Sequence, residues 1–133
     1  MGSRSQHISI DIKRPMAEVY GFAAEPLNLP KWAAGLATST VECDGDQWFS
    51  ESPMGRVAFA FAPRNDFGVL DHDVTLPSGQ TVHNPVRVIS DGDECEVVFT
   101  LRRRPEMTDE DFRHDADAVA RDLTTLKSVI EGR

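Results

Sequence analysis

The order of the elements that the hydrophobic pattern predicts is the strongest constraint on the fold of this chain. Residues 8–12 alternate between apolar and polar side chains, which is typical of a strand with one buried face. A helical stretch opens at Pro15 and runs past Trp32, and six alternating segments separated by turn residues follow it. One amphipathic helix, predicted over residues 108–131, closes the chain. A curved antiparallel sheet and one long helix can enclose an apolar cavity, so this order predicts a container for a small molecule.

The last helix has readable ends and one apolar face. Thr108 can cap its start, and the acidic residues 109–111 suit the positive end of the helix dipole. Gly132 is a fitting stop. The apolar residues at helical spacing are Phe112, Ala116, Val119, Leu123, Leu126 and Ile130. This stripe must be buried, and the inner face of the sheet is the available partner.

Four turn sequences predict how the strands pair. Asp44-Gly45 and Asp91-Gly92 are typical of two-residue hairpins, because Gly and Asp accept positive φ angles. The Asn65-Asp66 pair is a weaker turn of the same kind, and a three-residue loop at residues 78–80 keeps the faces consistent. The predicted cross-strand pairs are Val41 with Trp48, Phe59 with His72, His72 with Val86, Val86 with Val97, and Arg87 with Glu96.

Length and composition are typical of one ordinary globular domain. The sequence has 133 residues, of which 40% are hydrophobic and 27% charged. We expect a single domain over residues 6–133, preceded by a short segment, residues 1–5, that is disordered or left over from cloning. No apolar run approaches the roughly 20 residues that span a bilayer, so we expect no membrane insertion.

The net charge of −8 argues against a nucleic-acid partner, since proteins that bind nucleic acid usually present a basic face. The basic residues 102–104 are interpreted as a solvated strand end. Two cysteines, Cys43 and Cys95, are too few for a disulfide framework and lack metal-ligand spacing, which favours a cytoplasmic location. We expect neither a metal nor a cofactor, and a homodimer is one possible assembly.

The chain resembles the START/Bet v 1-like (SRPBCC) superfamily, and within it the polyketide cyclase/dehydrase-like proteins. The segments that carry the resemblance are residues 15–20 (PMAEVY), 28–33 (NLPKWA), 98–101 (VFTL), 107–112 (MTDEDF) and 122–127 (DLTTLK). The resemblance covers nearly the whole chain from Gln6 onward. These motifs mark the fold more than the chemistry.

The resemblance implies an α+β helix-grip fold. In this fold a seven-stranded antiparallel sheet wraps around the long C-terminal helix, and two short helices follow the first strand. It also implies a hydrophobic cavity for a lipid, sterol, polyketide or other aromatic compound. In that arrangement Cys43 and Cys95 lie at opposite ends of the sheet, too far apart to bond. Family members include cyclases, hydrolases, lipid carriers and hormone sensors, so the fold does not determine the function.

Polar residues that interrupt the predicted apolar face are the candidates for chemistry. They are Ser39, Ser50, His72 and Asn84. His72 is the side chain best suited to move a proton near neutral pH, and Asn84, its predicted diagonal neighbour, can hold a ligand oxygen. The alternative is a histidine that is satisfied by backbone or water and only lines a passive pocket. Strand alternation sends the flanking Asp71 and Asp73 to the other face, which argues against a metal site there.

Further residues are predicted to contact a bound molecule. Trp32 can cover the cavity mouth, although it can equally be a core residue that packs the short helix on the sheet. Asp115 and Asp122 lie off the apolar stripe and are interpreted as a solvated face or as partners of nearby arginines. The predicted ligand-binding residues are Trp32, Trp48, Ser50, Phe59, Phe61, Val86, Phe99 and Leu123.

Three functions remain open from the sequence. The first is a protein that binds a small hydrophobic or aromatic molecule and, if it is an enzyme, performs cyclase/dehydratase-type proton transfer with His72 and Asn84. The second is a non-catalytic carrier or sensor for a lipid or metabolite. The third is a protein-interaction module of the chaperone-cofactor type. No phosphate loop or nucleophile elbow occurs, which disfavours covalent catalysis.

Overall fold

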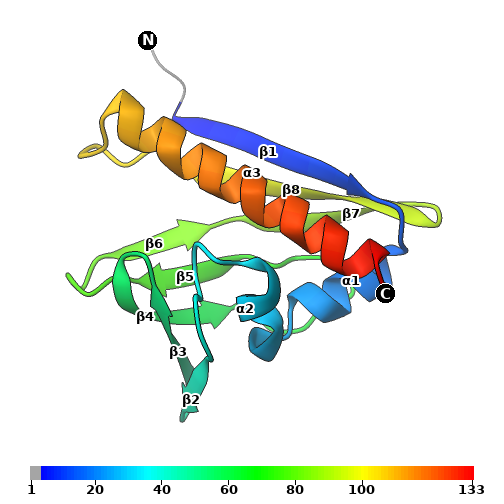
Figure 1. The fold of residues 1–133 in the computed structure, drawn as a ribbon, viewed down its shortest axis with the longest axis horizontal. Coiled ribbons are helices and arrows are strands. Elements are labelled where there is room, and N and C mark those ends of the chain that lie inside the picture. The colour runs from blue at the N-terminus through cyan, green and yellow to red at the C-terminus, as the bar shows by residue number, and fades with distance from the viewer. Residues whose placement is uncertain (1–3) are drawn as a thin grey trace.

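The computed structural model describes residues 4–133 and has an α+β fold with antiparallel sheets and a long C-terminal helix (Figure 1). Two short helices and a 3-10 turn follow the first strand. The strands are β1 (Ser5–Ile12), β2 (Glu42–Asp44), β3 (Gln47–Ser52), β4 (Gly55–Phe61), β5 (His72–Thr75), β6 (Thr81–Asn84), β7 (Val86–Asp91) and β8 (Glu94–Arg102). The helices are α1 (Met16–Ala23), η1 (Pro26–Asn28), α2 (Leu29–Trp32) and α3 (Asp109–Glu131).

The strands form two sheets, which corrects the prediction of one seven-stranded sheet. A three-stranded sheet has the order β1-β8-β7, and a five-stranded sheet has the order β2-β3-β4-β5-β6. The segment between the predicted turns at residues 78–80 and 91–92 is divided into β6 and β7 by Pro85. Proline has no N–H to donate to a ladder, so the pairing is interrupted at that residue.

The segment before β5 joins the two sheets. Leu70 N donates to Val86 O at 2.8 Å, Val88 N donates to Gly68 O at 2.8 Å, and Val69 forms an isolated bridge with Arg87. Gly68 has a φ of 74°, and a Cβ built there would lie 2.2 Å from Val88 O. Only glycine therefore fits where the segment approaches β7 so closely.

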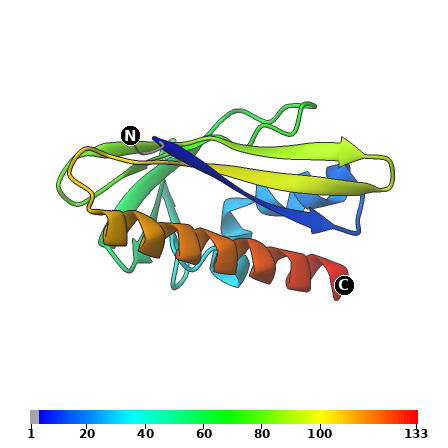
Figure 2. The ribbon, with the colours of Figure 1, turned by 90° about the horizontal axis from the view of Figure 1, so that it is seen from above.

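The start of the last helix is as predicted. Thr108 is the N-cap, and its hydroxyl accepts from Asp111 N at 3.0 Å, while Asp111 Oδ2 accepts from Thr108 N at 3.1 Å. This reciprocal pair is a capping box, with Asp in the place of the usual Glu. From that end α3 runs across one face of the sheet layer, as the view from above shows (Figure 2). Its apolar face buries Ala116, Leu123, Leu126 and Ile130.

The predicted strand registers are wrong by two residues at several hairpins. Cys43 pairs with Trp48, His72 with Phe61 and Asn84, and Val86 with Phe99. At the two Asp-Gly turns the loop residues are Gly-Asp, one position later than predicted, because Asp44 and Asp91 still pair in their strands. A shift of two residues leaves every side chain on its predicted face, since alternation in a strand has a period of two.

Two further expectations are corrected by the same geometry. Arg87 lies opposite Val98 rather than Glu96, and it pairs instead with Asp71. Asn65 forms no tight hairpin: its side chain organises a longer loop by accepting from Phe67 N and Val69 N, both at 3.0 Å. An Asn side chain that mimics backbone partners in this way is typical of Asx turns.

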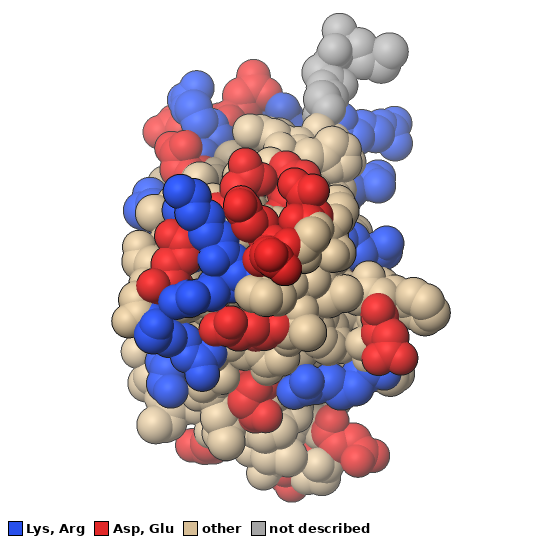
Figure 3. Space-filling view, turned by 90° about the vertical axis from the view of Figure 1, so that its right-hand side faces the viewer, with Lys and Arg blue, Asp and Glu red and all other residues tan. Residues whose placement is uncertain are grey.

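The remaining sequence expectations concern the ends, the cysteines and the surface. Ser5 pairs with Arg102 at the start of β1, while residues 1–3 of the predicted N-terminal segment lie outside the described residues. Cys43 is exposed and Cys95 is buried, and both are free. No helix within residues 4–133 has the length and hydrophobicity to cross a membrane. On the face in Figure 3, acidic side chains adjoin basic ones and no single sign dominates.

Candidate functional site

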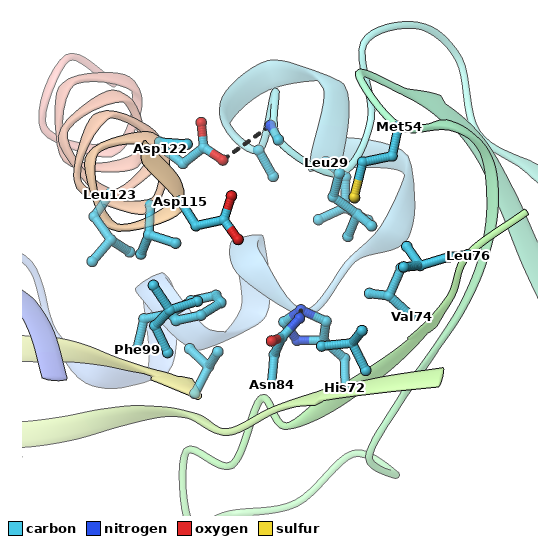
Figure 4. A pocket seen from close by; sticks show the side chains of 18 of the residues that line it. Leu29, Met54, His72, Val74, Leu76, Asn84, Phe99, Asp115, Asp122 and Leu123 are labelled. Carbon is cyan, nitrogen blue, oxygen red and sulfur yellow. Dashed lines mark hydrogen bonds between the residues drawn. The ribbon is translucent and has the colours of Figure 1, made fainter. Parts of the chain in front are cut away.

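A cavity of about 440 Å³ lies between α3, the α2 region and the inner face of the sheets. Its size is within the range of small-molecule pockets. The wall is mainly apolar, and Figure 4 shows side chains converging on the space from the helix side and from the strands. Lining residues from the sheets include Phe61, Leu70, Val74, Val82, Val86, Phe99 and Leu101, and those from the helical side include Ala23, Leu29, Trp32, Ala118, Val119 and Leu123.

His72 stands in this wall at the start of β5. Its ring lies between two aromatic rings, with centroid distances of 5.0 Å to Phe61 and 6.2 Å to Phe99. Nδ1 is 3.1 Å from Leu70 O. A carbonyl oxygen can only accept, so we assign the proton of the neutral ring to Nδ1, which leaves the lone pair on Nε2.

Asn84 lies directly opposite His72. The sequence had predicted a diagonal position. Its Nδ2 is 3.4 Å from His72 Nε2, a long hydrogen bond in which the amide donates to the ring lone pair. An amide nitrogen carries two hydrogens, and only one can point at the ring. The second N–H and the amide oxygen of Asn84 are therefore available to a molecule in the cavity.

The surroundings of His72 favour its neutral form. Burial lowers the pKa of His72, and the positive charge of a protonated His83 lowers it further, against opposing effects from the Leu70 carbonyl and from Asp71 and Asp73. A neutral imidazole can accept a proton or a hydrogen bond at Nε2. On the sheet side, the cavity wall thus presents the neutral imidazole of His72 beside the amide of Asn84, and neither group is charged.

Two carboxyl groups on α3 form a second polar region of the cavity, which corrects their interpretation as a solvated face. Asp115 and Asp122 are both half-buried and line the cavity. Asp122 Oδ2 accepts from Gly35 N at 3.1 Å, and Asp115 points from α3 into the space (Figure 4). Burial raises the pKa of each carboxyl. The sequence signal that could have revealed this lining is the helical spacing of residues 111, 115, 118 and 122, which share one face of the helix.

Charged groups at the rim of the cavity largely neutralise one another. Arg104 Nε is 3.1 Å from Glu106 Oε1, and Gln80 Nε2 donates to the same oxygen at 3.1 Å. His114 and Met54 also line this part of the cavity and are exposed. The sequence pattern had not indicated Met54, Arg104 or Glu106 as ligand contacts, whereas the position of His114 near the start of the long helix allowed a contact with an entering ligand, with solvent exposure favoured.

The structure brings most of the predicted site residues together. His72, Asn84, Trp32, Phe61, Val86, Phe99 and Leu123 all line the cavity. Trp48 lines a separate hollow of about 180 Å³ beside Tyr20 and Arg64. Ser50 is buried and donates to Leu36 O at 2.8 Å, while Phe59 is buried with its ring centroid 6.0 Å from that of Phe61. These three residues do not line the cavity.

The outer face of the sheets carries a cluster of charges around Asp71. Its carboxylate accepts from Arg87 Nε at 3.0 Å and Arg87 NH2 at 2.9 Å, and also from Val86 N at 2.9 Å. These donors lower the pKa of Asp71. His83 bonds Asp73 at 2.6 Å on the same face. Within residues 4–133 no group of three or more His, Cys, Asp or Glu side chains is arranged to hold a metal ion.

Comparison with solved structures identifies the fold. A START superfamily protein from Mycobacterium smegmatis superimposes with a TM-score of 0.68 at 9% identity, over 98% of this chain and 99% of that chain. The Aha1 dimer from Colwellia psychrerythraea gives 0.76 at 18% identity, over 96% of both chains. DynU16, from the dynemicin biosynthetic locus, gives 0.74 at 10% identity, over 98% of this chain and 48% of that chain. The chain has a START/Bet v 1-like fold.

The sequence comparisons add nothing to this assignment, since no protein-family model and no curated protein matches the chain. The identities to the solved structures are all low, so these structures support the fold and leave the chemistry to the residues of this chain.

Proposed function

We propose that this protein binds a small apolar molecule carrying an oxygen group. The apolar body of the guest lies between α3 and the sheets, and its oxygen is held by Asn84 beside His72. The observation that carries the proposal is an apolar cavity of about 440 Å³ with one paired polar contact in its wall. Pockets with a mainly apolar lining and a few polar groups that fix orientation are typical of small-molecule sites.

The unused hydrogen-bonding capacity of Asn84 supports this orientation. Its second N–H can donate to a carbonyl or hydroxyl oxygen, and its amide oxygen can accept from a hydroxyl. The two rings that flank His72, those of Phe61 and Phe99, offer surfaces to a flat guest. A carrier or sensor needs no more than these contacts.

A catalytic function is a second candidate, and the assigned tautomer of His72 favours it. The contact of Nε2 with Asn84 Nδ2 is long, at 3.4 Å, and once the amide turns to bind a carbonyl oxygen the neutral Nε2 is suited to removing a proton next to that carbonyl, as in an aldol-type cyclisation or dehydration. DynU16, a protein of the dynemicin biosynthetic locus, shares this fold, which is compatible with such a role. No carboxylate orients the ring of His72, whose Nδ1 faces Leu70 O, so binding alone remains our primary proposal.

An interaction module is the third candidate, prompted by the fold shared with the Aha1 dimer. The exposed side chains of Leu27, Met54, Phe67 and Ile89 could contribute to a protein interface, including one between two copies of this chain. The cavity argues for the ligand-binding proposal, because an interaction module needs no internal space.

Two measurements test the binding proposal. Native mass spectrometry of the purified protein should detect a retained apolar compound. Prodan, a neutral aromatic ketone whose emission shifts to the blue in apolar surroundings, should bind with one site. Ala118 lines the cavity, whereas Ala120 on the same helix is exposed, so Ala118→Phe should weaken prodan binding at least about tenfold and Ala120→Phe should not.

The catalytic candidate needs a different comparison. If His72 acts as a base, His72→Gln retains ligand binding but loses turnover of a carbonyl substrate, while Asn84→Ala weakens binding and turnover together. A protein that retains no compound and leaves prodan unshifted would contradict the binding proposal.

A further inference from the structure

We propose that this cavity selects neutral or basic guests and excludes anions such as carboxylates. The inference rests on the binding function proposed above and adds the charge class of the guest. It follows from where the structure places negative and positive groups around the cavity, not from the net charge of the whole chain. Asp115 and Asp122 are the lining carboxyls that no described Lys or Arg side chain pairs with in a salt bridge, and Arg104, which also lines the cavity, is paired with Glu106.

Among the described residues the carboxylates of Asp115 and Asp122 form no salt bridge, although the charge of Arg104 lowers the pKa of Asp115 and that of Arg121 lowers the pKa of Asp122. Within residues 4–133, neither group forms an ion pair with a Lys or Arg side chain. Asp122 Oδ2 accepts from Gly35 N at 3.1 Å, and a further contact with the Ala34 backbone also lowers the pKa of this carboxyl against the effect of burial. Asp115 points into the cavity with neither oxygen in a hydrogen bond to a described residue (Figure 4). A positive or hydrogen-bond-donating group of a guest can therefore approach both.

The cavity offers no comparable partner to an anion. Of the lining residues that the structure describes, Arg104 is the only Lys or Arg, and Glu106 lies 3.1 Å from its Nε. His72 is held in its neutral form by burial, which lowers its pKa. His114 lies at the exposed rim, where solvent screens electrostatic interactions with a guest. A guest carboxylate would thus lose its hydration without gaining a salt bridge, and it would face two like charges.

The two polar regions together define a two-ended guest. An amine or hydroxyl group at one end donates to Asp115 from the α3 side, and an oxygen at the other end meets Asn84 and His72 on the sheet side. The raised pKa of both carboxyls indicates that burial penalises their ionised forms. A cationic group would relieve that penalty, so it gains more here than at an exposed carboxylate.

A matched ligand series tests this selectivity. The probes are 1-naphthylmethylamine, 1-naphthylmethanol and 1-naphthylacetate, which share one aromatic body and differ in charge at pH 7. Titration calorimetry at about 0.15 M salt suppresses long-range attraction by the acidic surface, since the Debye length is then about 8 Å. We expect the amine to bind at least about tenfold more tightly than the acetate, with the alcohol between them.

Isosteric variants identify the responsible groups. Asp115→Asn and Asp122→Asn should each reduce the ratio of amine to acetate affinity by about threefold or more. Asn retains an oxygen that accepts from Gly35 N, so Asp122→Asn keeps this backbone contact. Asp117→Asn is the control, because Asp117 is exposed on the same helix, does not line the cavity, and changes the net charge equally. We expect that variant to leave the ratio unchanged.

The outcomes separate this inference from the binding proposal. Prodan binding together with equal affinity for acetate and amine overturns the charge selectivity and leaves the binding function standing. A preference for amine that survives both Asp115→Asn and Asp122→Asn also overturns the inference, because the carboxylates are then not its cause. Failure of prodan and of all three naphthyl probes refutes the binding function itself.

Discussion

Asn84 Nδ2 lies 3.4 Å from His72 Nε2 across the β5–β6 pair, while Nδ1 of the same ring lies 3.1 Å from Leu70 O. The two contacts occupy both nitrogens of the ring, with an acceptor on one side and a donor on the other. A doubly protonated imidazolium would require the amide of Asn84 to turn its oxygen toward Nε2, since two N–H donors cannot share one hydrogen bond. Burial is the main cause of the lowered pKa of His72, and the contact with the Leu70 carbonyl opposes it.

The first prediction concerns the titration of His72. Its pKa should lie below the ordinary value of 6.5, and nitrogen NMR at pH 7 should show the neutral ring with the proton on Nδ1. His72→Gln identifies the resonances among the four histidines of the chain. Titration above 6.5, or a proton on Nε2, would refute the assignment.

The same pKa has a consequence for stability. Because the folded state binds the proton of His72 less readily than the unfolded state, His72 costs no stability above pH 6.5, and its contribution becomes unfavourable as the pH falls through that value. The slope from one group is at most about 1.4 kcal/mol per pH unit. Urea denaturation between pH 7.5 and 5.5 should therefore show a shallower loss of stability in His72→Gln than in the wild type.

The fold was predictable to the level of elements and faces. The Thr108 cap and the apolar stripe after it locate α3 because capping and periodicity are local properties. Residue pairing between strands was harder to predict, since a hairpin can shift by two residues without exposing any apolar side chain. The division into two sheets depends on Pro85, whose missing N–H matters only once the neighbouring strand is known.

The candidate site was predictable where a polar residue interrupts an apolar strand face. His72 and Asn84 meet that criterion, and they line the cavity together. Asp115 and Asp122 do not, because a polar helix face is normally solvated and only the packing of α3 shows that its edge borders a cavity. Trp48 and Phe59 lie on the predicted face but do not line the cavity, since a periodic pattern does not show how deep a side chain lies.

The contact between Asp122 and Gly35 predicts a coupled pair of substitutions. A Cβ at Gly35 would lie 3.0 Å from Asp122 Oδ2, so Gly35→Ala should lower the free energy of unfolding by about 1 kcal/mol. In an Asp122→Ala background the same change should cost much less, because the crowded oxygen is gone. Urea denaturation of the four proteins measures the coupling.

Gly21 supplies the control for that cycle. It lies within α1, and a Cβ built there meets nothing within 4 Å. Gly21→Ala should therefore raise stability by about 0.5–1 kcal/mol through helix propensity alone. A cost for Gly35→Ala that is unchanged by Asp122→Ala would show that the contact does not limit the space at Gly35.

Gly68 should be the least replaceable of the turn glycines with positive φ. Its φ of 74° strains any other residue, and an added Cβ would lie 2.2 Å from Val88 O. Gly79 has a φ of 91°, but a Cβ added there would meet no atom within 4 Å. Substitution of Gly79 therefore measures the backbone strain without the steric clash. Gly79→Ala should cost about 1–2 kcal/mol, and Gly68→Ala at least about 3 kcal/mol or the fold itself. Equal costs in urea denaturation would show that the segment can move away from β7.

The last prediction uses the two cysteines as reporters of local opening. Cys43 is exposed, whereas Cys95 is buried in β8, where desolvation raises the pKa of its thiol to about 11. A disulfide reagent at pH 8 needs both access and thiolate, so it should modify Cys43 quickly and Cys95 at least about 100-fold more slowly. Denaturation in urea should make the two rates similar, and Cys43→Ser removes the fast phase so that Cys95 can be followed alone. Rapid modification of Cys95 in the native Cys43→Ser protein would mean that β8 opens on that timescale, which its central place between β1 and β7 argues against.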